Sequence, residues 1–206
     1  MKFQITFCTA LALLLGQPVL AQAADAPAVN ANSPFDEISS QAQAGNAEAQ
    51  FQLARRYESG QGVAQDLQQA LSWYQKAAAQ NHPIAQNNLG GMYNTGRGVT
   101  QDRAQAMAWY RKAADQGNAT AQNNLGSMYK NGLGVARDNA QAVFWFRKAA
   151  DQGYAIAQSN LAFMYQNGLG VTQDKQQATQ LYQSAAAQNK DPVARQKAQQ
   201  SLSQLR

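Results

Sequence analysis

The chain of 206 residues repeats itself every 36 residues. Laid over itself at that offset, the sequence aligns four times without a gap, over residues 47–82, 83–118, 119–154 and 155–190. Each unit carries the same tyrosine, glycine pair, valine and aspartate, which in the first unit are Tyr57, Gly60, Gly62, Val63 and Asp66. A fixed period of this length is typical of solenoids, in which each unit buries its apolar face against its neighbours. The sequence therefore predicts one stacked array for residues 47–190.

Within each unit, the apolar positions follow the spacing of two helices. Ala49, Leu53 and Tyr57 lie four residues apart and indicate a first helix. A second apolar stripe has intervals of three and four residues, and in the first unit it consists of Ala70, Trp73, Tyr74, Ala77 and Ala78. We therefore predict an all-α fold with two helices in each unit and no strand.

Recurring residues also indicate where each helix ends and begins. Gly60 and its equivalents follow the first helix, where a residue that tolerates positive φ is needed. Asp66 and Gln69, three residues apart, have the spacing of a capping box and recur in every unit. We expect the aspartate to cap the second helix and the glutamine to reach back to the aspartate's backbone N–H.

Two further columns predict contacts between helices. Ala54 and its equivalents are alanine or glycine, which indicates that another helix approaches closely at this position. A glutamine falls at a core-facing angle of each first helix, although its side chain is polar. We predict that each is buried and hydrogen-bonded to backbone at a junction between repeats. These residues are Gln50, Gln86, Gln122 and Gln158.

The two ends of the array differ from the repeats, as the ends of solenoids do. Residues 34–46 indicate an N-terminal capping helix, and residues 191–206 indicate an amphipathic C-terminal capping helix. Residues 24–33 contain small residues, proline and asparagine, and we expect them to be a disordered lead.

Residues 1–23 have the features of a secretory signal peptide. Lys2 precedes a mostly apolar stretch over residues 5–15, and Ala21 and Ala23 form a small-residue cleavage site. The apolar stretch is too short to span a bilayer, and no later segment is apolar enough to do so. We expect cleavage after Ala23 and a periplasmic or secreted protein.

The composition leaves little for catalysis. Cys8 is the only cysteine and lies in the predicted signal peptide, and His82 is the only histidine. Neither a metal site nor a catalytic triad can be assembled from these residues. The net charge of +5 is spread along the chain and does not indicate a nucleic-acid partner. We expect no catalytic residue, no cofactor and no metal ion.

The repeat motif resembles a known family. Residues 119–150 read Ala-x-Ala-Gln-x-x-Leu-Gly-x-x-Tyr, then Gly-x-Gly-Val, Asp-x-x-Gln-Ala and Trp-Phe-x-Lys-Ala-Ala. This pattern is similar to the Sel-like repeat family, a relative of the tetratricopeptide repeats, over residues 47–190. The resemblance implies a right-handed superhelix of helix pairs that acts as an adaptor for protein partners.

One alternative function comes from a short motif. Ser127 and Lys130 match S-x-x-K, the nucleophile motif of penicillin-recognising enzymes, and some cysteine-rich members of the resembled family have been linked to penicillin binding. The chain has neither the S-D-N nor the K-T-G motif, nor the disulfides of those relatives. A hydrolase acting on cell-wall or β-lactam substrates is therefore the alternative, and coincidence is the preferred interpretation.

The preferred function is an exported scaffold that binds another exported or envelope protein. One face of the first helices points away from the core stripe, and by resemblance to tetratricopeptide arrays it is the concave groove. Its candidate partner-binding residues are Phe51, Asn87, Asn123, Ser127, Lys130, Ser159 and Phe163. We expect the two phenylalanines to be exposed anchors and the asparagines to pair with an extended peptide. The basic residues of the second helices are expected on a solvated outer face.

Overall fold

The computed structural model describes residues 29–188 and 192–203, which contain ten α-helices and no strand. The helices are α1 Phe35–Gln43, α2 Ala47–Ser59, α3 Leu67–Ala79, α4 Pro83–Thr95, α5 Arg103–Asp115, α6 Ala119–Asn131, α7 Asn139–Asp151, α8 Ala155–Asn167, α9 Lys175–Gln188 and α10 Pro192–Ser203. Each 36-residue unit supplies one pair, from α2 and α3 to α8 and α9. The prediction of an all-α fold with two helices per unit is confirmed for the described residues.

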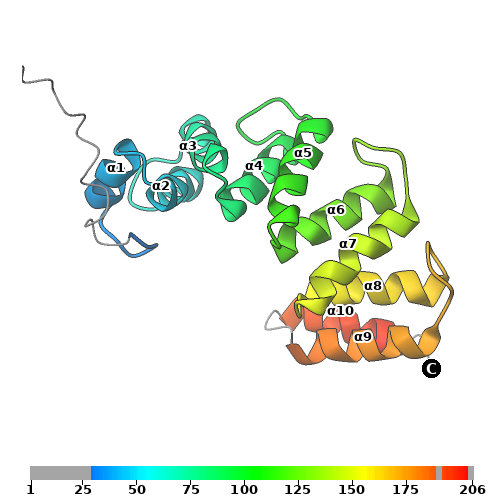
Figure 1. Cartoon of the computed structure of the whole chain (residues 1–206). Helices are drawn as coiled ribbons and strands as arrows, with labels where there is room; N and C mark the ends of the chain where they lie inside the picture. The colour runs from blue at the N-terminus through cyan, green and yellow to red at the C-terminus, as the bar shows by residue number, and fades with distance from the viewer. Residues whose placement is uncertain (1–28, 189–191, 204–206) are drawn as a thin grey trace, which may run out of the picture.

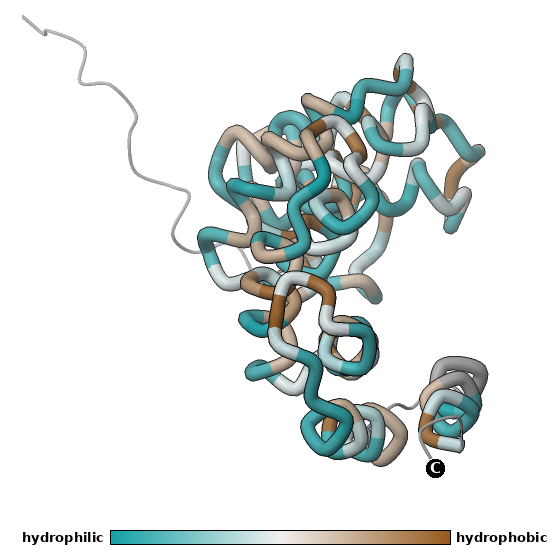
Figure 2. Tube along the Cα trace, turned by 90° about the vertical axis from the view of Figure 1, so that its right-hand side faces the viewer, coloured by the Kyte–Doolittle hydropathy of each residue, from teal (hydrophilic) through white to brown (hydrophobic). Residues whose placement is uncertain are grey.

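The helices stack in chain order along an arc (Figure 1). The main contacts join each helix to the next one in the chain, so that α1 and α10 lie at opposite ends of the array. Short apolar stretches alternate with polar ones along the coloured part of the trace (Figure 2). Within the described ranges, no helix is long and apolar enough to cross a membrane.

Glycine ends each first helix, as predicted. Gly60, Gly96, Gly132 and Gly168 have φ values of 74°, 73°, 66° and 63°. The second glycine of each loop also has positive φ, and in the later repeats it packs on the preceding repeat. A Cβ atom on Gly134 would lie 2.7 Å from the carbonyl oxygen of Arg103, the first residue of α5. Each loop of the later repeats therefore joins the two helices of its own repeat and contacts the repeat before it.

The second helices are capped by aspartate, but the capping box is only half formed. The Asp138 carboxylate accepts a hydrogen bond from the Gln141 N–H at 2.9 Å, and Asp66, Asp102 and Asp174 accept equivalent bonds. The Asp138 N–H donates to the carbonyl oxygen of Tyr129 at 3.0 Å, and this bond also recurs in every repeat. The expectation that the glutamine side chain returns to this N–H is therefore wrong, because the end of the first helix already accepts it.

The small-residue column and the glutamine column behave as predicted. A Cβ atom on Gly126 would lie 2.6 Å from the ring of Phe146. The close approach of the second helix of the same repeat therefore requires a residue without a side chain here. The four column glutamines are buried, and each Nε2 donates to a carbonyl oxygen of the preceding helix. In the third repeat, Gln122 Nε2 lies 3.1 Å from the oxygen of Ala114.

The end of the predicted disordered lead contacts the first helices. Val29 is buried against α1 and α2, and the Arg56 guanidinium donates to the carbonyl oxygens of Ala31 and Ser33 at 2.9 Å each. Composition alone does not reveal these contacts. Residues 24–28 of the expected lead and the expected signal peptide lie outside the described residues.

One further helix packs on each end of the array. The first is α1, which buries Ile38 and Ala42 against α2. The second is α10, whose Ala198 packs with Tyr182 and Ala185 of α9. Residues 191 and 204–206 of the expected C-terminal helix fall outside the described part of the chain.

Candidate functional site

The first helices expose large apolar side chains on the face that the sequence singled out. Ile84 on α4 is 46% exposed, and Ile156 and Phe163 on α8 are 45% and 42% exposed. Phe144, on α7, is the other large apolar side chain with comparable exposure in the described residues. The expectation that Phe163 is an exposed aromatic is confirmed.

Phe51 is not exposed. Its side chain is 5% exposed, and its ring stacks on that of His82 with centroids 4.6 Å apart. His82 is the N-cap of α4, since its Nδ1 accepts from the Ala85 N–H at 3.1 Å, while its Nε2 lies 3.0 Å from Glu48 Oε2. The expectation of an exposed Phe51 anchor is therefore wrong, because the cap of the next repeat covers the ring.

The two predicted asparagines are engaged within the chain. Asn123 is 7% exposed, and its Oδ1 accepts from Asn160 Nδ2 at 2.8 Å. Asn87 is half-buried, and its Oδ1 accepts from Asn124 Nδ2 at 3.1 Å. The oxygens expected to pair with a partner's backbone are thus already hydrogen-bonded to the next repeat.

Sequence reasoning missed this second asparagine column. Asn88, Asn124 and Asn160 lie 36 residues apart on α4, α6 and α8, so the period itself could have revealed them. Asn124 and Asn160 each bond to the asparagine column of the repeat before. The equivalent partner of Asn88 is Phe51, which has no acceptor, and Asn88 Nδ2 instead bonds to the Tyr74 hydroxyl at 3.0 Å.

The remaining candidates lie in the C-terminal half of the face. Ser127, Lys130 and Ser159 are half-buried, whereas Phe163 is exposed. Lys130 Nζ lies 5.3 Å from the centroid of the Phe163 ring, so these two residues are brought together across neighbouring repeats. They line a hollow of about 370 Å³ together with Asn131, Arg137 and Leu169. The hollow combines an apolar wall with basic side chains.

The two S-x-x-K residues, Ser127 and Lys130, are not hydrogen-bonded to each other. Among the described residues, the Ser127 hydroxyl has no hydrogen-bond partner, and the Lys130 ammonium lies over Phe163. A nucleophilic hydroxyl needs a base within hydrogen-bond reach. In the same part of the chain, no three His, Cys, Asp or Glu side chains converge as metal ligands.

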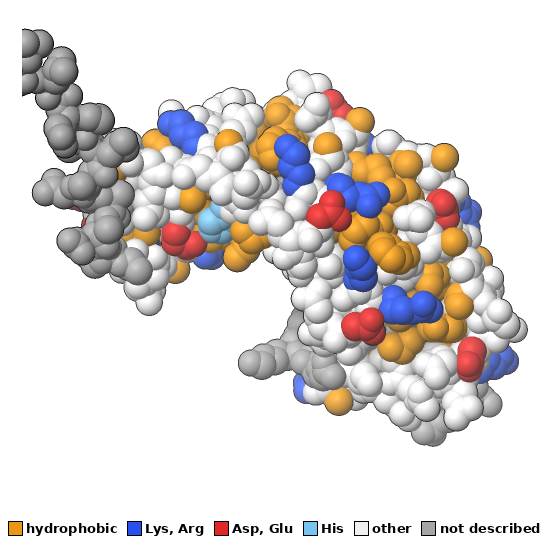
Figure 3. All heavy atoms as spheres, viewed as in Figure 1, with side chains coloured by type: hydrophobic (Ala, Val, Ile, Leu, Met, Phe, Trp, Pro, Cys, Tyr) orange, Lys and Arg blue, Asp and Glu red, His pale blue; other side chains and the backbone are white. Residues whose placement is uncertain are grey.

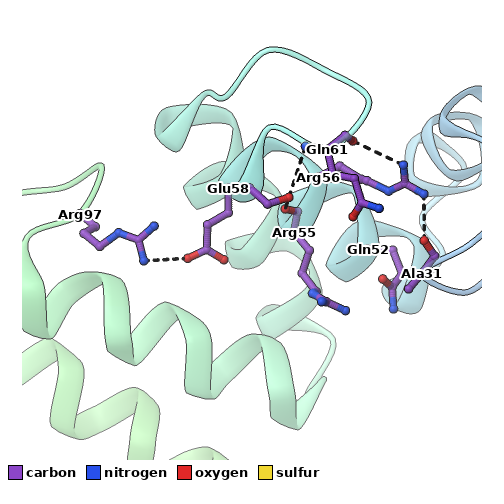
Figure 4. A pocket seen from close by; sticks show the side chains of 8 residues that line it. Ala31, Gln52, Arg55, Arg56, Glu58, Gln61 and Arg97 are labelled. Atoms are coloured by element: carbon purple, nitrogen blue, oxygen red, sulfur yellow. Dashed lines mark hydrogen bonds and ion pairs between the residues drawn. The ribbon is translucent and has the colours of Figure 1, made fainter.

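A second hollow, of about 330 Å³, lies near the N-terminal end of the face (Figure 4). Glu58 points towards Arg97 of the next repeat, and their side chains form an ion pair at 3.1 Å. Arg56 points the other way, towards Ala31. Most charged groups of this hollow are therefore engaged in holding the array together.

Buried tyrosines lie behind this part of the face. The Tyr74 hydroxyl donates to Glu58 Oε2 at 2.6 Å, and burial together with the Glu58 carboxylate raises the Tyr74 pKa well above its ordinary value. Burial alone raises the pKa of Tyr110 to about 12. Both hydroxyls therefore remain protonated, and able to donate, at neutral pH.

The second helices pair cations with aromatic rings. Lys76 Nζ lies 3.7 Å from the Trp73 ring centroid, and Lys112 Nζ lies 4.1 Å from that of Trp109. Lys and Arg side chains lie among apolar side chains over the right half of the array (Figure 3). Lys76, Lys112 and Lys148 are exposed, as expected of an outer face, but their ammonium groups lie over aromatic rings of their own helices.

The family follows from the repeats themselves. The Sel1 repeat model matches residues 47–82, 83–118, 119–154 and 155–190, the same segments that the period delimits. The chain belongs to the Sel1 repeat family. Sel1 repeats generally form protein-interaction scaffolds, and this Sel1 repeat protein is a right-handed α-solenoid of helix–turn–helix units.

Solved structures agree with this assignment. The Sel1 repeat protein is 34% identical to c5321, a protective antigen present in uropathogenic Escherichia coli strains that displays an SLR fold, with a TM-score of 0.73. It is 32% identical to a Sel1 repeat protein from Oxalobacter formigenes, with a TM-score of 0.75. Each match covers 82% of this chain, which spans 40% and 65% of those two chains.

A more distant match is informative about the fold alone. Helicobacter pylori cysteine rich protein B is 23% identical, with a TM-score of 0.50, over 66% of this chain and 96% of that one. The comparison with functionally curated proteins gives no match.

Proposed function

We propose that this Sel1 repeat protein is an exported scaffold that binds another exported or envelope protein through the face of its first helices. The observation that carries the proposal is that Ile84, Ile156 and Phe163, all on first helices, are exposed. Exposed large apolar side chains on a polar face are a feature of interaction surfaces. The signal-peptide features of residues 1–23 support export, to the periplasm or the medium.

Phe163 is the proposed main anchor, with Lys130 and the hollow beside it. Ser127, Ser159 and Asn87 lie on the same face and are proposed to contact the partner around this anchor, whereas Phe51 and Asn123 support the face from within. An aromatic side chain at the centre of an interface contributes more to binding than the polar rim around it. Burying a phenylalanine ring contributes about 1.5–3 kcal/mol, which is a tenfold effect or more on Kd.

The proposal is tested by placing a photo-crosslinking amino acid at position 163 in producing cells. The matched control carries it at position 112, on the cation-rich second helices. We expect position 163 to crosslink one recurrent exported protein, identified by mass spectrometry, and position 112 not to do so. Phe163→Ala should then weaken capture of that protein about tenfold, while Lys112→Glu with Lys148→Glu should change it little. The reverse pattern would move the binding surface to the second helices.

Export is tested separately. Mass spectrometry of the N-terminal peptide of the protein recovered from the periplasm or medium should show a chain that begins at Ala24. Absence of the protein from both fractions would remove the export part of the proposal, and an intact N-terminus in the recovered protein would remove only the predicted cleavage after Ala23.

A further inference from the structure

One largely buried tyrosine on the proposed binding face has a hydroxyl with no hydrogen-bond partner among the described residues. Four aromatic residues occupy equivalent places on the second helices: Tyr74, Tyr110, Phe146 and Tyr182. The Tyr74 hydroxyl donates to Glu58 Oε2, and the Tyr182 hydroxyl donates to Gln166 Oε1 at 3.1 Å. Tyr110, whose side chain is 5% exposed, makes no hydrogen bond within the described chain.

The sequence explains why Tyr110 differs. The residue equivalent to Glu58 and Gln166 is Asn94, whose side chain is one methylene shorter. Asn94 Oδ1 is itself buried and has no partner in the described residues. An acceptor and a donor that are paired in the first and fourth repeats are therefore both left unpaired in the second.

The other candidate partner of Tyr110 is engaged elsewhere. Asn88 bonds to the hydroxyl of Tyr74, so the equivalent contact for Tyr110 would come from Asn124. Asn124 Nδ2 instead donates to Asn87 Oδ1 in the preceding repeat. The Tyr110 side chain is held in place by burial, and its hydroxyl is left to hydrogen-bond to whatever occupies the pocket that it lines.

The Tyr110 hydroxyl faces such a pocket. It lines a hollow of about 350 Å³ with Glu58, Asn87, Asn88, Gly91, Met92, Thr95, Arg97 and Asn124. Gly91 leaves it open, because the equivalent residues in the other repeats carry side chains and a Cβ atom on Gly91 would lie 3.7 Å from the Tyr110 hydroxyl. The pocket lies on the face proposed above to bind the partner.

The pocket favours a neutral polar group. Its only charged lining residues, Glu58 and Arg97, are paired with each other, so a buried ligand charge would meet no uncompensated counter-charge. The Tyr110 hydroxyl can donate, and Asn124 Oδ1 accepts no hydrogen bond from the described residues. A carboxylate only accepts and an ammonium only donates, whereas a primary carboxamide does both.

We propose that this pocket binds the carboxamide of an asparagine or glutamine in an extended segment of the partner protein. The inference rests on the proposed function, because the pocket lies on the proposed interface and would select one polar side chain of the partner. Apolar anchoring then falls to Phe163, and recognition of one carboxamide falls to Tyr110 and Asn124.

The test uses phage-displayed random linear peptides selected on the purified chain and counter-selected on Gly91→Phe, which fills the pocket. Selected peptides should share an asparagine or glutamine at one position. Tyr110→Phe should weaken their binding about threefold to tenfold, the effect of one hydrogen bond. The fold tolerates this change, because Phe146 occupies the equivalent place against Gly126. The matched control is Tyr93→Phe, because the Tyr93 hydroxyl faces Gln75 on α3 instead of the pocket.

A third variant separates recognition from structure. Asn94→Gln restores the side chain that pairs with tyrosine in the fourth repeat, so it should engage the Tyr110 hydroxyl internally. It should raise the melting temperature and weaken the selected peptides to the same degree as Tyr110→Phe. A purely structural Tyr110 predicts no change in peptide binding with either variant.

Two results would overturn the inference. One is a set of peptides that bind Gly91→Phe and Tyr110→Phe as tightly as the unaltered chain but lose binding with Phe163→Ala, which would leave the proposed function standing. The other is a shared acidic, basic or apolar residue in place of the carboxamide. Failure to select any peptide would count against both proposals.

Discussion

Three of the four column glutamines, Gln50, Gln86 and Gln122, link three consecutive helical segments, whereas the Oε1 atom of Gln158 is buried without a partner in the described residues. Gln122 on α6 donates to Ala114 at the end of α5, and its Oε1 accepts from Gln152 Nε2, just after α7, at 2.7 Å. The same pair of bonds occurs at Gln50 and Gln86. One carboxamide thus satisfies polar groups on both sides of a junction where water is excluded.

Replacing such a glutamine with leucine leaves those partners unpaired. Gln122→Leu should lower the free energy of unfolding by about 1–3 kcal/mol, the cost of an unsatisfied buried polar group. Urea denaturation followed by circular dichroism measures the change. Gln105→Leu, on the exposed side of α5, is the control and should shift the midpoint little. Equal midpoints for the two variants would show that the junction bonds are dispensable.

The buried tyrosine gives the stability a defined pH dependence. The folded state raises the Tyr110 pKa to about 12 from an ordinary 10.0, so the folded chain keeps a proton that the unfolded chain releases near pH 10. This contribution to stability is complete below pH 10 and disappears as the pH rises to about 12. Tyr110→Phe should therefore lose less stability between about pH 9 and pH 11 than the unaltered chain, measured by urea midpoints at both pH values. Parallel losses would contradict the burial of this hydroxyl.

At the scale of the element, the loop between the two helices of a repeat is also a contact between repeats. Gly134 has a φ of 72° and no room for a side chain beside Arg103, whereas Gly117 has a φ of 88° and open space around it. The two glycines share a backbone preference but differ in packing.

This difference predicts two effects of unequal size. Gly117→Ala should be destabilised by the left-handed conformation alone, about 1–2 kcal/mol. Gly134→Ala should be destabilised further, because the clash with the Arg103 carbonyl displaces the loop from α5. Thermal unfolding of both variants, followed by circular dichroism, gives the comparison. A Gly134→Ala protein no less stable than Gly117→Ala would mean that the loop does not support the preceding repeat.

The elements themselves could be predicted because their signals recur. A glycine or aspartate that appears four times at one period identifies a helix end far better than a single occurrence does. The reciprocal glutamine of the capping box could not be excluded, because its competitor is a carbonyl oxygen nine residues earlier that only the folded loop brings close.

The proposed binding face was predicted less well, since its residues vary between repeats. Phe163 could be identified from its angle on the helix, but Phe51 at a similar angle is covered by His82. Which side chain covers which depends on the packing of one repeat on the next, and a helical wheel of a single repeat does not contain that information.

At the scale of the whole molecule, each repeat depends mainly on its two neighbours. Removing residues 119–154 joins Asn118 to Ala155 and places Gln158 where Gln122 had been, with Ala114 as its acceptor. The shortened chain should fold with fewer helical residues and a lower melting temperature, because it keeps fewer stabilising interfaces between repeats.

Removal of half a period is the matched control. Deleting residues 119–136 joins α5 directly to a second helix of another repeat and mismatches the interface. This chain should aggregate or unfold, as judged by size-exclusion chromatography and circular dichroism. Two deletions with the same behaviour would show that the array is not built from interchangeable units.

The start of α8 has a mechanical consequence. Its N-cap, Tyr154, makes no side-chain capping bond, unlike Asn46, His82 and Asn118 at the other first helices. The Gln158 bond to Ala150 is 3.4 Å long, against 3.1 Å for the other three column glutamines. A pull on the two ends of the array loads the junctions in series, so the weakest one yields first. Under tension, α8 to α10 should separate as one unit while the remainder stays folded. This junction then sets the force that the array can withstand.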